Sequence, residues 1–216
     1  NGLVLELDAG QRASYSGAGN TWYDLSGNNL NGTLTNGPTF SGIGATSSLV
    51  FDGSNDYVDI PSTLLVNASS FTYEAVFKIT TAADGNSLLS LNYSSPSSGY
   101  LVRQTTGNYL IVYTNNGTEP SISSNSTISN NTIYHLTVVQ SGGSCSIYFN
   151  GTLDKTASLA NPVLTSSNPT FIGRRGLPIY GAQLLGNIYT TRLFNRALSA
   201  YEVKQNFDYY RTRYNI

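Results

Sequence analysis

The sequence predicts an all-β fold, namely a two-sheet antiparallel jelly-roll sandwich with one short C-terminal helix. Short apolar segments recur along the 216 residues, and turns rich in Gly, Asn, Ser and Asp separate them. Charged residues make up only 11% of the chain, whereas Tyr (16) and Gly (21) are abundant. Roughly a dozen strands at this spacing, with one helical segment, favour a sandwich over a parallel α/β sheet.

The first half of the chain shows a long loop and one clearly alternating strand. Strands are expected at Leu3–Leu7, Ser48–Phe51, Tyr57–Ile60 and Phe71–Ile79, with a loop from Asp8 to Gly32. In the last strand Phe71, Tyr73, Ala75, Phe77 and Ile79 share one face. A period of two indicates a half-buried strand, so Glu74 is expected on the opposite face.

The second half continues as hairpins and ends in a helix. The expected strands are Ser87–Tyr93, Tyr100–Gln104, Tyr109–Thr114, Ile133–Gln140, Ser144–Asn150, Thr152–Thr156, Thr170–Gly173 and Leu185–Phe194. Ser199 and Glu202 have the spacing of a capping box, in which each side chain accepts a hydrogen bond from a first-turn N–H group. We expect the helix to run to about Arg211.

Charge and composition exclude several classes of partner. The net charge is −1, and no stripe of Lys and Arg is present to neutralise phosphates, so we expect no nucleic-acid binding. No apolar run is long enough for membrane insertion. Cys145 is the only cysteine and is expected to be buried. No signal peptide and no initiating Met are visible, so we expect either a mature form or a fragment of a longer protein. Because no linker and no internal repeat divide the sequence, we interpret residues 1–216 as one domain.

An ordered set of motifs spans nearly the whole chain. They are the segments 22–34 (WYDLSGNNLNGTL), 49–58 (LVFDGSNDYV), 71–75 (FTYEA), 134–138 (YHLTV), 147–151 (IYFNG), 171–174 (FIGR) and 195–202 (NRALSAYE). Together they resemble the LamG-like jelly-roll family of the concanavalin A-like lectin/glucanase superfamily. That resemblance implies the sandwich fold, but the fold hosts lectins, adhesins, glycosidases and spacers alike.

The two ends of the chain carry a narrower resemblance. Residues 2–10 (GLVLELDAG) and 205–214 (QNFDYYRTRY) resemble LamG-like domains in virion proteins of tailed bacteriophages. This resemblance implies a location on a virion surface, and the other context we expect is an extracellular or bacterial surface protein.

Catalysis is not expected. Glycoside hydrolysis needs two carboxylates that flank the bond to be cut, and Glu74 stands alone on its strand. We interpret Glu74 as a solvated strand residue or as half of a structural pair. His135 is the only histidine and lies inside an alternating strand, where a structural role is the better interpretation.

A sugar-binding surface is expected from aromatic and planar polar side chains on or near loops. The candidates are Tyr93, Tyr100, Arg103, Arg174, Arg175 and Tyr180. Because tyrosine is abundant throughout, the alternative is that several of these rings simply cover the sheets.

Calcium is the one metal that the sequence suggests. Asp52, Asp56 and Asp59 cluster around one turn, and hard cations take several oxygen ligands. Aspartates also bond to turn amides, which is the competing interpretation. Tyr189 and Thr190 stand where the resembled family often has acidic residues, which favours the turn interpretation.

We therefore predict a non-catalytic recognition module, a carbohydrate-binding or adhesin domain of a phage virion or cell-surface protein. Its expected partner is a surface glycan or polysaccharide. The alternative is a structural decoration or spacer domain that contacts other virion or surface proteins, and association into a homo-oligomer is a further expectation.

Overall fold

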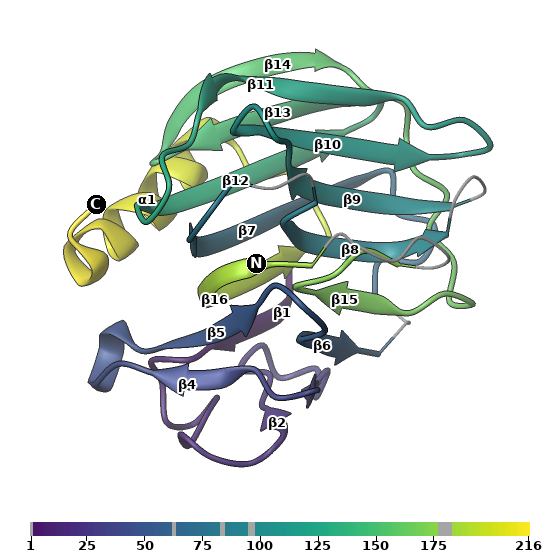
Figure 1. Cartoon of the computed structure of the whole chain (residues 1–216). Helices are drawn as coiled ribbons and strands as arrows, with labels where there is room; N and C mark the ends of the chain where they lie inside the picture. The colour runs from purple at the N-terminus through teal and green to yellow at the C-terminus, as the bar shows by residue number, and fades with distance from the viewer. Residues whose placement is uncertain (1, 62–63, 83–84, 95–97, 177–182) are drawn as a thin grey trace.

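The computed structural model describes residues 2–61, 64–82, 85–94, 98–176 and 183–216. Within these residues the chain forms two antiparallel sheets of eight strands each, packed face to face, with one α-helix beside them (Figure 1). The predicted jelly-roll sandwich with a C-terminal helix is confirmed. No helix in these ranges is both long and apolar enough to cross a membrane.

The first sheet contains the strand with the clean alternation at its centre. Its strands are β1 (Leu3–Asp8), β4 (Thr39–Ser41), β5 (Ser48–Asp52), β7 (Ser70–Ile79), β12 (Ile133–Ser141), β13 (Ser144–Phe149), β14 (Thr152–Ser158) and β16 (Leu185–Phe194). Their order is β14-β13-β12-β7-β16-β5-β4, and β1 also pairs with β16. Strands from both ends of the sequence are therefore neighbours.

The second sheet is built from the remaining strands. They are β2 (Thr21–Trp22), β3 (Gly32–Thr35), β6 (Tyr57–Ile60), β8 (Ser87–Ser94), β9 (Ser98–Gln104), β10 (Tyr109–Asn115), β11 (Ser121–Thr127) and β15 (Thr170–Ile172). Their order is β11-β10-β9-β8-β15-β6-β3-β2. The sequence did not reveal β11, because its Ser, Asn and Thr residues resemble a loop. It also missed the short strands β2, β3 and β4, and β2 lies inside the loop expected from Asp8 to Gly32.

The core lies between the two sheets. All five alternating residues of β7 belong to it, and Trp22 and Cys145 are fully buried there. Full burial of each large apolar side chain contributes about 1.5–3 kcal/mol. The period-two pattern thus identified the inward face of β7 correctly.

Helix α1 (Ala200–Tyr214) covers the outer face of the first sheet. The predicted capping box is present, since the Ser199 side chain accepts from the Glu202 N–H and the Glu202 carboxylate accepts from the Ser199 N–H. The helix runs beyond Arg211 because Tyr214 packs against Tyr189 of β16, with ring centroids 5.1 Å apart. Asn215, in the left-handed conformation, then ends it.

Candidate functional site

Four of the predicted sugar-binding residues lie on or beside the outer face of the second sheet. Val102, Val112 and Ile172 of its strands point into the core, so the residues next to them in the strands face away from it. Arg103, Tyr113 and Phe171 are such residues. No helix among the described residues covers this face, in contrast to the outer face of the first sheet.

Each arginine on this face lies against an aromatic ring. The Arg103 guanidinium carbon is 5.2 Å from the Tyr113 ring centroid, and the Arg175 carbon is 4.9 Å from that of Tyr93. The Arg174 carbon lies 4.6 Å from two centroids, those of Tyr57 and Phe171. We call this set the arginine–aromatic strip, and its members are Tyr57, Tyr93, Arg103, Tyr113, Phe171, Arg174 and Arg175. Such contacts contribute about 0.5–1 kcal/mol each when exposed.

Tyr93 is only 1% exposed, so the expectation that its ring binds a sugar directly is corrected. Its hydroxyl lies between two charged side chains. Its hydroxyl donates to Glu119 Oε1 at 2.6 Å and accepts from Arg175 Nη2 at 2.8 Å, and Arg175 and Glu119 form an ion pair at 3.5 Å. Burial and the hydrogen bond to Glu119 raise the pKa of Tyr93 to about 12, although the nearby Arg175 charge acts in the other direction. The phenol is therefore neutral at physiological pH. Sequence reasoning missed Glu119, which lies in the loop between β10 and β11 and belongs to no recognisable motif.

Two predicted sugar-binding residues do not contribute to this surface. Tyr100 is fully buried, its ring makes an edge-to-face contact with Phe71 at 4.8 Å, and its hydroxyl lies 3.6 Å from Cys145 Sγ. A ring in the core offers no face to a ligand, so the expectation that Tyr100 binds a sugar is corrected. Tyr180 lies outside the described residues.

The three aspartates proposed for calcium serve other roles. Asp56 Oδ2 accepts from the Asp52 N–H at 3.1 Å, and Asp52 Oδ1 accepts from the Ser54 N–H at 2.8 Å. Asp59 lies instead on the outer face of the second sheet, where Arg174 counters its charge. In the described part of the chain no three His, Cys, Asp or Glu side chains come close enough to hold a metal ion. Asp52 and Asp56 thus act as the turn interpretation expects, whereas Asp59 lies on strand β6.

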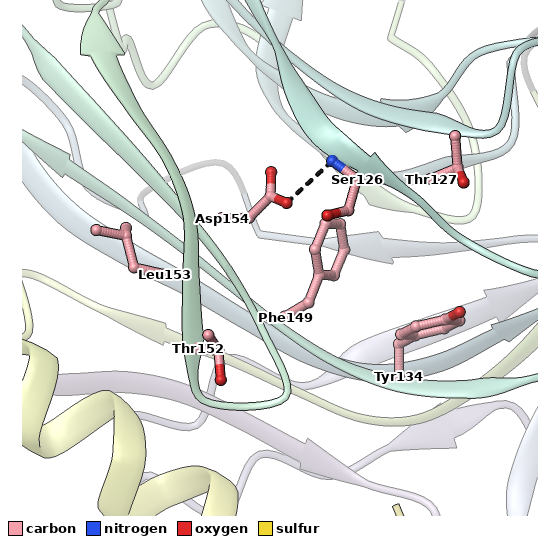
Figure 2. A pocket seen from close by; sticks show the side chains of 7 residues that line it. All are labelled: Ser126, Thr127, Tyr134, Phe149, Thr152, Leu153 and Asp154. Carbon is pink, nitrogen blue, oxygen red and sulfur yellow. Dashed lines mark hydrogen bonds between the residues drawn. The ribbon is translucent and has the colours of Figure 1, made fainter.

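A pocket of about 220 Å³ lies where the edge strands of the two sheets meet, β11 of the second sheet and β14 of the first (Figure 2). It is lined by Ser126, Thr127, Tyr134, Phe149, Thr152, Leu153 and Asp154. We call it the end pocket. The sequence did not indicate it, because its residues come from four strands and only the fold brings them together.

The polar and aromatic groups of the end pocket are fixed in place. The Asp154 carboxylate accepts from the backbone N–H groups of Asn125 at 2.6 Å and Ser126 at 2.9 Å. The Tyr134 and Phe149 rings meet at 65° with centroids 6.0 Å apart. The Tyr134 hydroxyl accepts from the Ser129 N–H at 3.0 Å, so that its ring is anchored at both ends.

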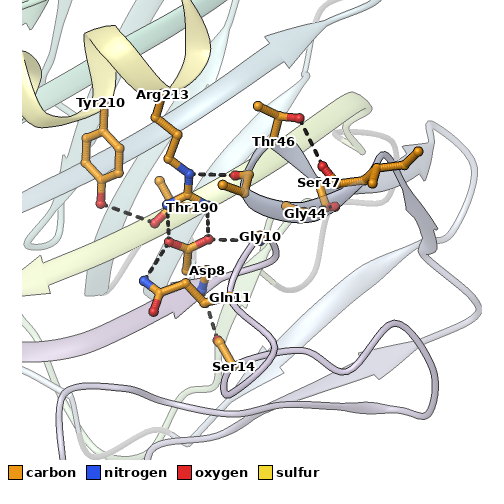
Figure 3. A network of polar contacts seen from close by, with 12 residues as sticks. Asp8, Gly10, Gln11, Ser14, Gly44, Thr46, Ser47, Thr190, Tyr210 and Arg213 are labelled. Carbon is orange, nitrogen blue, oxygen red and sulfur yellow. Dashed lines mark hydrogen bonds and ion pairs between the residues drawn. The ribbon is translucent and has the colours of Figure 1, made fainter.

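A second hollow of about 180 Å³ lies beside a structural network (Figure 3). Asp8, buried in β1, forms a bidentate ion pair with Arg213 of α1 and also accepts from the Gly10 N–H and the Gln11 side chain. Arg213 additionally donates to the Ala45 carbonyl. This network fastens the end of α1 to the first strand.

Glu74 and His135 lie beneath α1, sealed from solvent. His135 Nε2 is 3.1 Å from Glu74 Oε1, and Arg192 Nε donates to Glu74 Oε2 at 2.8 Å. The rings of Phe207 and Tyr210 lie against His135. Glu74 is therefore half of a structural pair and is not solvated, because the helix covers the face that alternation alone would leave exposed. An external substrate cannot reach this carboxylate.

Two solved structures of similar shape are toxin or insecticidal-protein binding domains. The botulinum neurotoxin serotype G binding domain superposes with a TM-score of 0.74 at 19% identity and covers 96% of this chain and 51% of that chain. The binding domain of Paraclostridial Mosquitocidal Protein 1 gives 0.73 at 17%, with 97% and 52% covered. This chain thus spans about half the length of those domains.

Domain 4 of AbnA, an extracellular GH43 arabinanase from Geobacillus stearothermophilus, matches over nearly its whole length. Its structure in complex with arabinotriose superposes with a TM-score of 0.69 at 17% identity and covers 94% of this chain and 97% of that one. At these identities the likeness shows the fold alone. A comparison with curated protein sequences gives no match.

A family model also matches residues 52–204, well over half of the chain, and includes the β7 strand, the Tyr134–Phe149 hairpin and the start of α1. The resemblance drawn from the ordered motifs is thereby confirmed. The chain belongs to the Laminin_G_3 family of the concanavalin A-like lectin/glucanases superfamily.

Proposed function

We propose that this chain is a non-catalytic module that recognises glycans through the outer face of its second sheet. The observation that carries the proposal is the arginine–aromatic strip, which runs across a sheet face that no described helix covers. Arg103, Arg174 and Arg175 are the binding residues of this proposal, and residues 1–216 act in it as one domain. Tyr93, which is buried, contributes by holding Arg175 in position.

The chemistry of the strip suits a polar, ring-shaped ligand. A guanidinium is planar and presents several N–H donors in a fixed fork, which matches paired hydroxyl or carboxylate oxygens of a sugar. The contacts with aromatic rings hold Arg174 and Arg175 in position, so little side-chain entropy is lost on binding. The arabinotriose complex of a similarly sized arabinanase domain supports a carbohydrate as the ligand class.

The absence of catalysis is part of the same proposal. Glu74, the candidate that sequence analysis singled out, is sealed beneath α1 and bonded to Arg192. On the strip, Glu119 forms an ion pair with Arg175, which stabilises its carboxylate in the charged form and does not suit a general acid.

We place the module outside the cell or on a virion surface. The similar structures include an extracellular arabinanase and toxin binding domains, which supports an exterior setting. The likeness of the two chain ends to phage virion domains supports the virion in particular.

The test is a binding screen with plant, bacterial and animal polysaccharides, including arabinan, with and without a calcium chelator. We expect binding that the chelator does not abolish and that Arg174→Ala and Arg175→Ala each weaken at least about tenfold, equivalent to 1.4 kcal/mol. Arg211→Ala is the matched control, because Arg211 is an exposed arginine on α1, on the other side of the molecule. Binding that both strip variants retain would exclude the strip.

A second candidate function, contact with other proteins, rests on the exposed surface of α1. Tyr201 and Tyr209 are 72% and 60% exposed, and with Gln205 they share one face of the helix at four-residue spacing. Tyrosines of this kind are enriched in protein interfaces. Association that Tyr201→Ala and Tyr209→Ala abolish in sedimentation analysis, together with an empty glycan screen, would favour this function.

A further inference from the structure

The end pocket has three properties of a ligand site that differ from those of the arginine–aromatic strip. It is concave, it combines two aromatic rings with hydroxyls and one carboxylate, and it lies at the open end of the sandwich where β11 and β14 meet. We infer that it is a second carbohydrate site, which takes a single neutral sugar ring. This site stands apart from the strip and does not require it.

Asp154 is the polar centre of the pocket. A carboxylate has about four lone-pair positions, and two of them accept the Asn125 and Ser126 N–H groups. In addition, the Asn125 side-chain amide donates to the Asp154 carbonyl at 2.7 Å, so backbone and side chain are both fixed. The remaining positions can accept two hydroxyls of a sugar. A carboxylate that is already held loses little side-chain entropy on binding.

The aromatic side of the pocket suits the C–H face of a sugar. Tyr134 and Phe149 are half-buried and meet at an angle, so that they form an apolar corner. Leu153, 52% exposed, lies at the rim of the same hollow. Apolar walls with a few fixed polar groups are what small-ligand sites share.

The size and charge of the end pocket limit the class of ligand that it can bind. About 220 Å³ is less than the roughly 300–1,000 Å³ typical of pockets for drug-sized ligands, so one ring fits and an oligosaccharide does not. Asp154 is the only charged side chain that lines the pocket among the described residues. An acidic sugar would be repelled by it, and the Ser126, Thr127 and Thr152 hydroxyls suit a ligand rich in hydroxyls. The ligand class is therefore a neutral monosaccharide or the terminal ring of a neutral chain.

The experiment follows the resonances of the full chain by NMR during titration with separate probes. The neutral probes are the methyl glycosides of arabinofuranose, glucose, galactose, mannose and N-acetylglucosamine. N-acetylneuraminic acid serves as the anionic probe, and tetramethylammonium as the cationic one, because a carboxylate beside aromatic rings also suits a quaternary ammonium. We expect at least one neutral glycoside to shift the resonances of Tyr134 and Phe149, and neither charged probe to do so.

Two variants separate loss of the site from loss of the fold. Thr152→Trp fills the hollow from an exposed position, and Asp154→Ala removes the acceptor. Each should weaken neutral-glycoside binding at least about tenfold. Because Asp154→Ala also breaks the link to β11, Thr152→Trp is the decisive variant, and Gln205→Trp on the exposed face of α1 is its control.

Each outcome is decisive. A neutral glycoside whose binding is lost in Thr152→Trp but kept in Gln205→Trp and Arg174→Ala supports the inference. Failure of every neutral probe, binding of a charged probe alone, or binding that Thr152→Trp leaves unchanged overturns it. Loss of polysaccharide binding in Arg174→Ala reports on the strip alone, so the two proposals can fail separately.

Discussion

Glu74 and Arg192 face each other across the β7–β16 pair, and their side chains form an ion pair that α1 covers. The Glu74 side chain is 1% exposed and that of Arg192 is 13% exposed. Their contact joins the two central strands of the first sheet, and the Asn206 side chain of the helix donates to the same Glu74 oxygen. One carboxylate thus connects both strands with the helix.

Removal of this carboxylate should destabilise the protein strongly. Glu74→Gln leaves Arg192 beneath the helix without its ion-pair partner, although the Glu6 charge still acts on it, and loss of one partner of a buried pair costs about 3 kcal/mol. The free energy of unfolding from urea titration measures the change. Asp208→Asn, which breaks exposed pairs on α1, is the control and should leave the midpoint nearly unchanged. Equal midpoints for wild type and Glu74→Gln would contradict a structural role for the pair.

Acid should lower the free energy of unfolding by protonating Glu74. Burial alone would raise the pKa of Glu74, but the Arg192 charge and the His135 contact outweigh it and hold this pKa below its ordinary value of 4.5. A group with a lowered pKa in the folded state contributes stability that is complete above the ordinary pKa and is lost as the pH falls through the folded-state pKa. The stability difference between wild type and Glu74→Gln should therefore shrink below about pH 4.5. Urea titrations between neutral and acidic pH measure it, and a constant difference would refute the assignment.

Cys145 should be inert in the folded protein. Its side chain is fully buried, and burial raises the pKa of its thiol to about 12, although the hydrogen bond with Tyr100 opposes this. A thiol-specific reagent should react only as fast as the chain unfolds, and with one equivalent in urea. Ser16→Cys, which places a thiol at an exposed position, should react at once and serves as the control. Rapid labelling of the wild-type chain would show that the sheets open locally around Tyr100.

A side chain at Gly151 should destabilise the protein. Its φ of +72° is a conformation that residues with a Cβ rarely adopt, and a Cβ there would lie 2.8 Å from the Phe207 ring of α1. Gly142 also has a positive φ, of +53°, but faces open space. We expect Gly142→Ala to cost about 1 kcal/mol and Gly151→Ala about 2 kcal/mol more, because the helix must also move. Thermal and urea unfolding of both variants compare the two costs, and equal values would show that Phe207 adapts freely.

Local patterns predicted the elements whose cause is local. The alternation of β7 and the capping box of Ser199 and Glu202 were both confirmed, since each depends only on spacing along the chain. The burial of Glu74 could not be predicted in this way. Alternation shows which face of β7 points away from the core. It cannot show that α1, which begins more than a hundred residues later, packs over that face.

The candidate sites likewise contain residues that a local pattern identifies and residues that only the tertiary structure brings together. Arginines near loops were identified by residue type, but Tyr100 has the same residue type as Tyr93 and only the register sends it into the core. Glu119 and Asp154 had no signal in the sequence, because each acts through partners on other strands. The end pocket needs four strands to exist, so no local pattern could reveal it.

The pairing of β1 with β16 constrains how this chain can fold. Strand β16 also joins β7 to β5, so the first sheet remains in separate pieces until residues 185–194 arrive. In the second sheet, β15 likewise joins β8 to β6. Strands this distant in sequence can pair only after large loops close. The chain loses conformational entropy in this closure before the new contacts stabilise it, which makes folding slow. During that interval the edges of β5 and β7 expose unpaired backbone groups, so the chain is most prone to aggregate before β16 has paired with them.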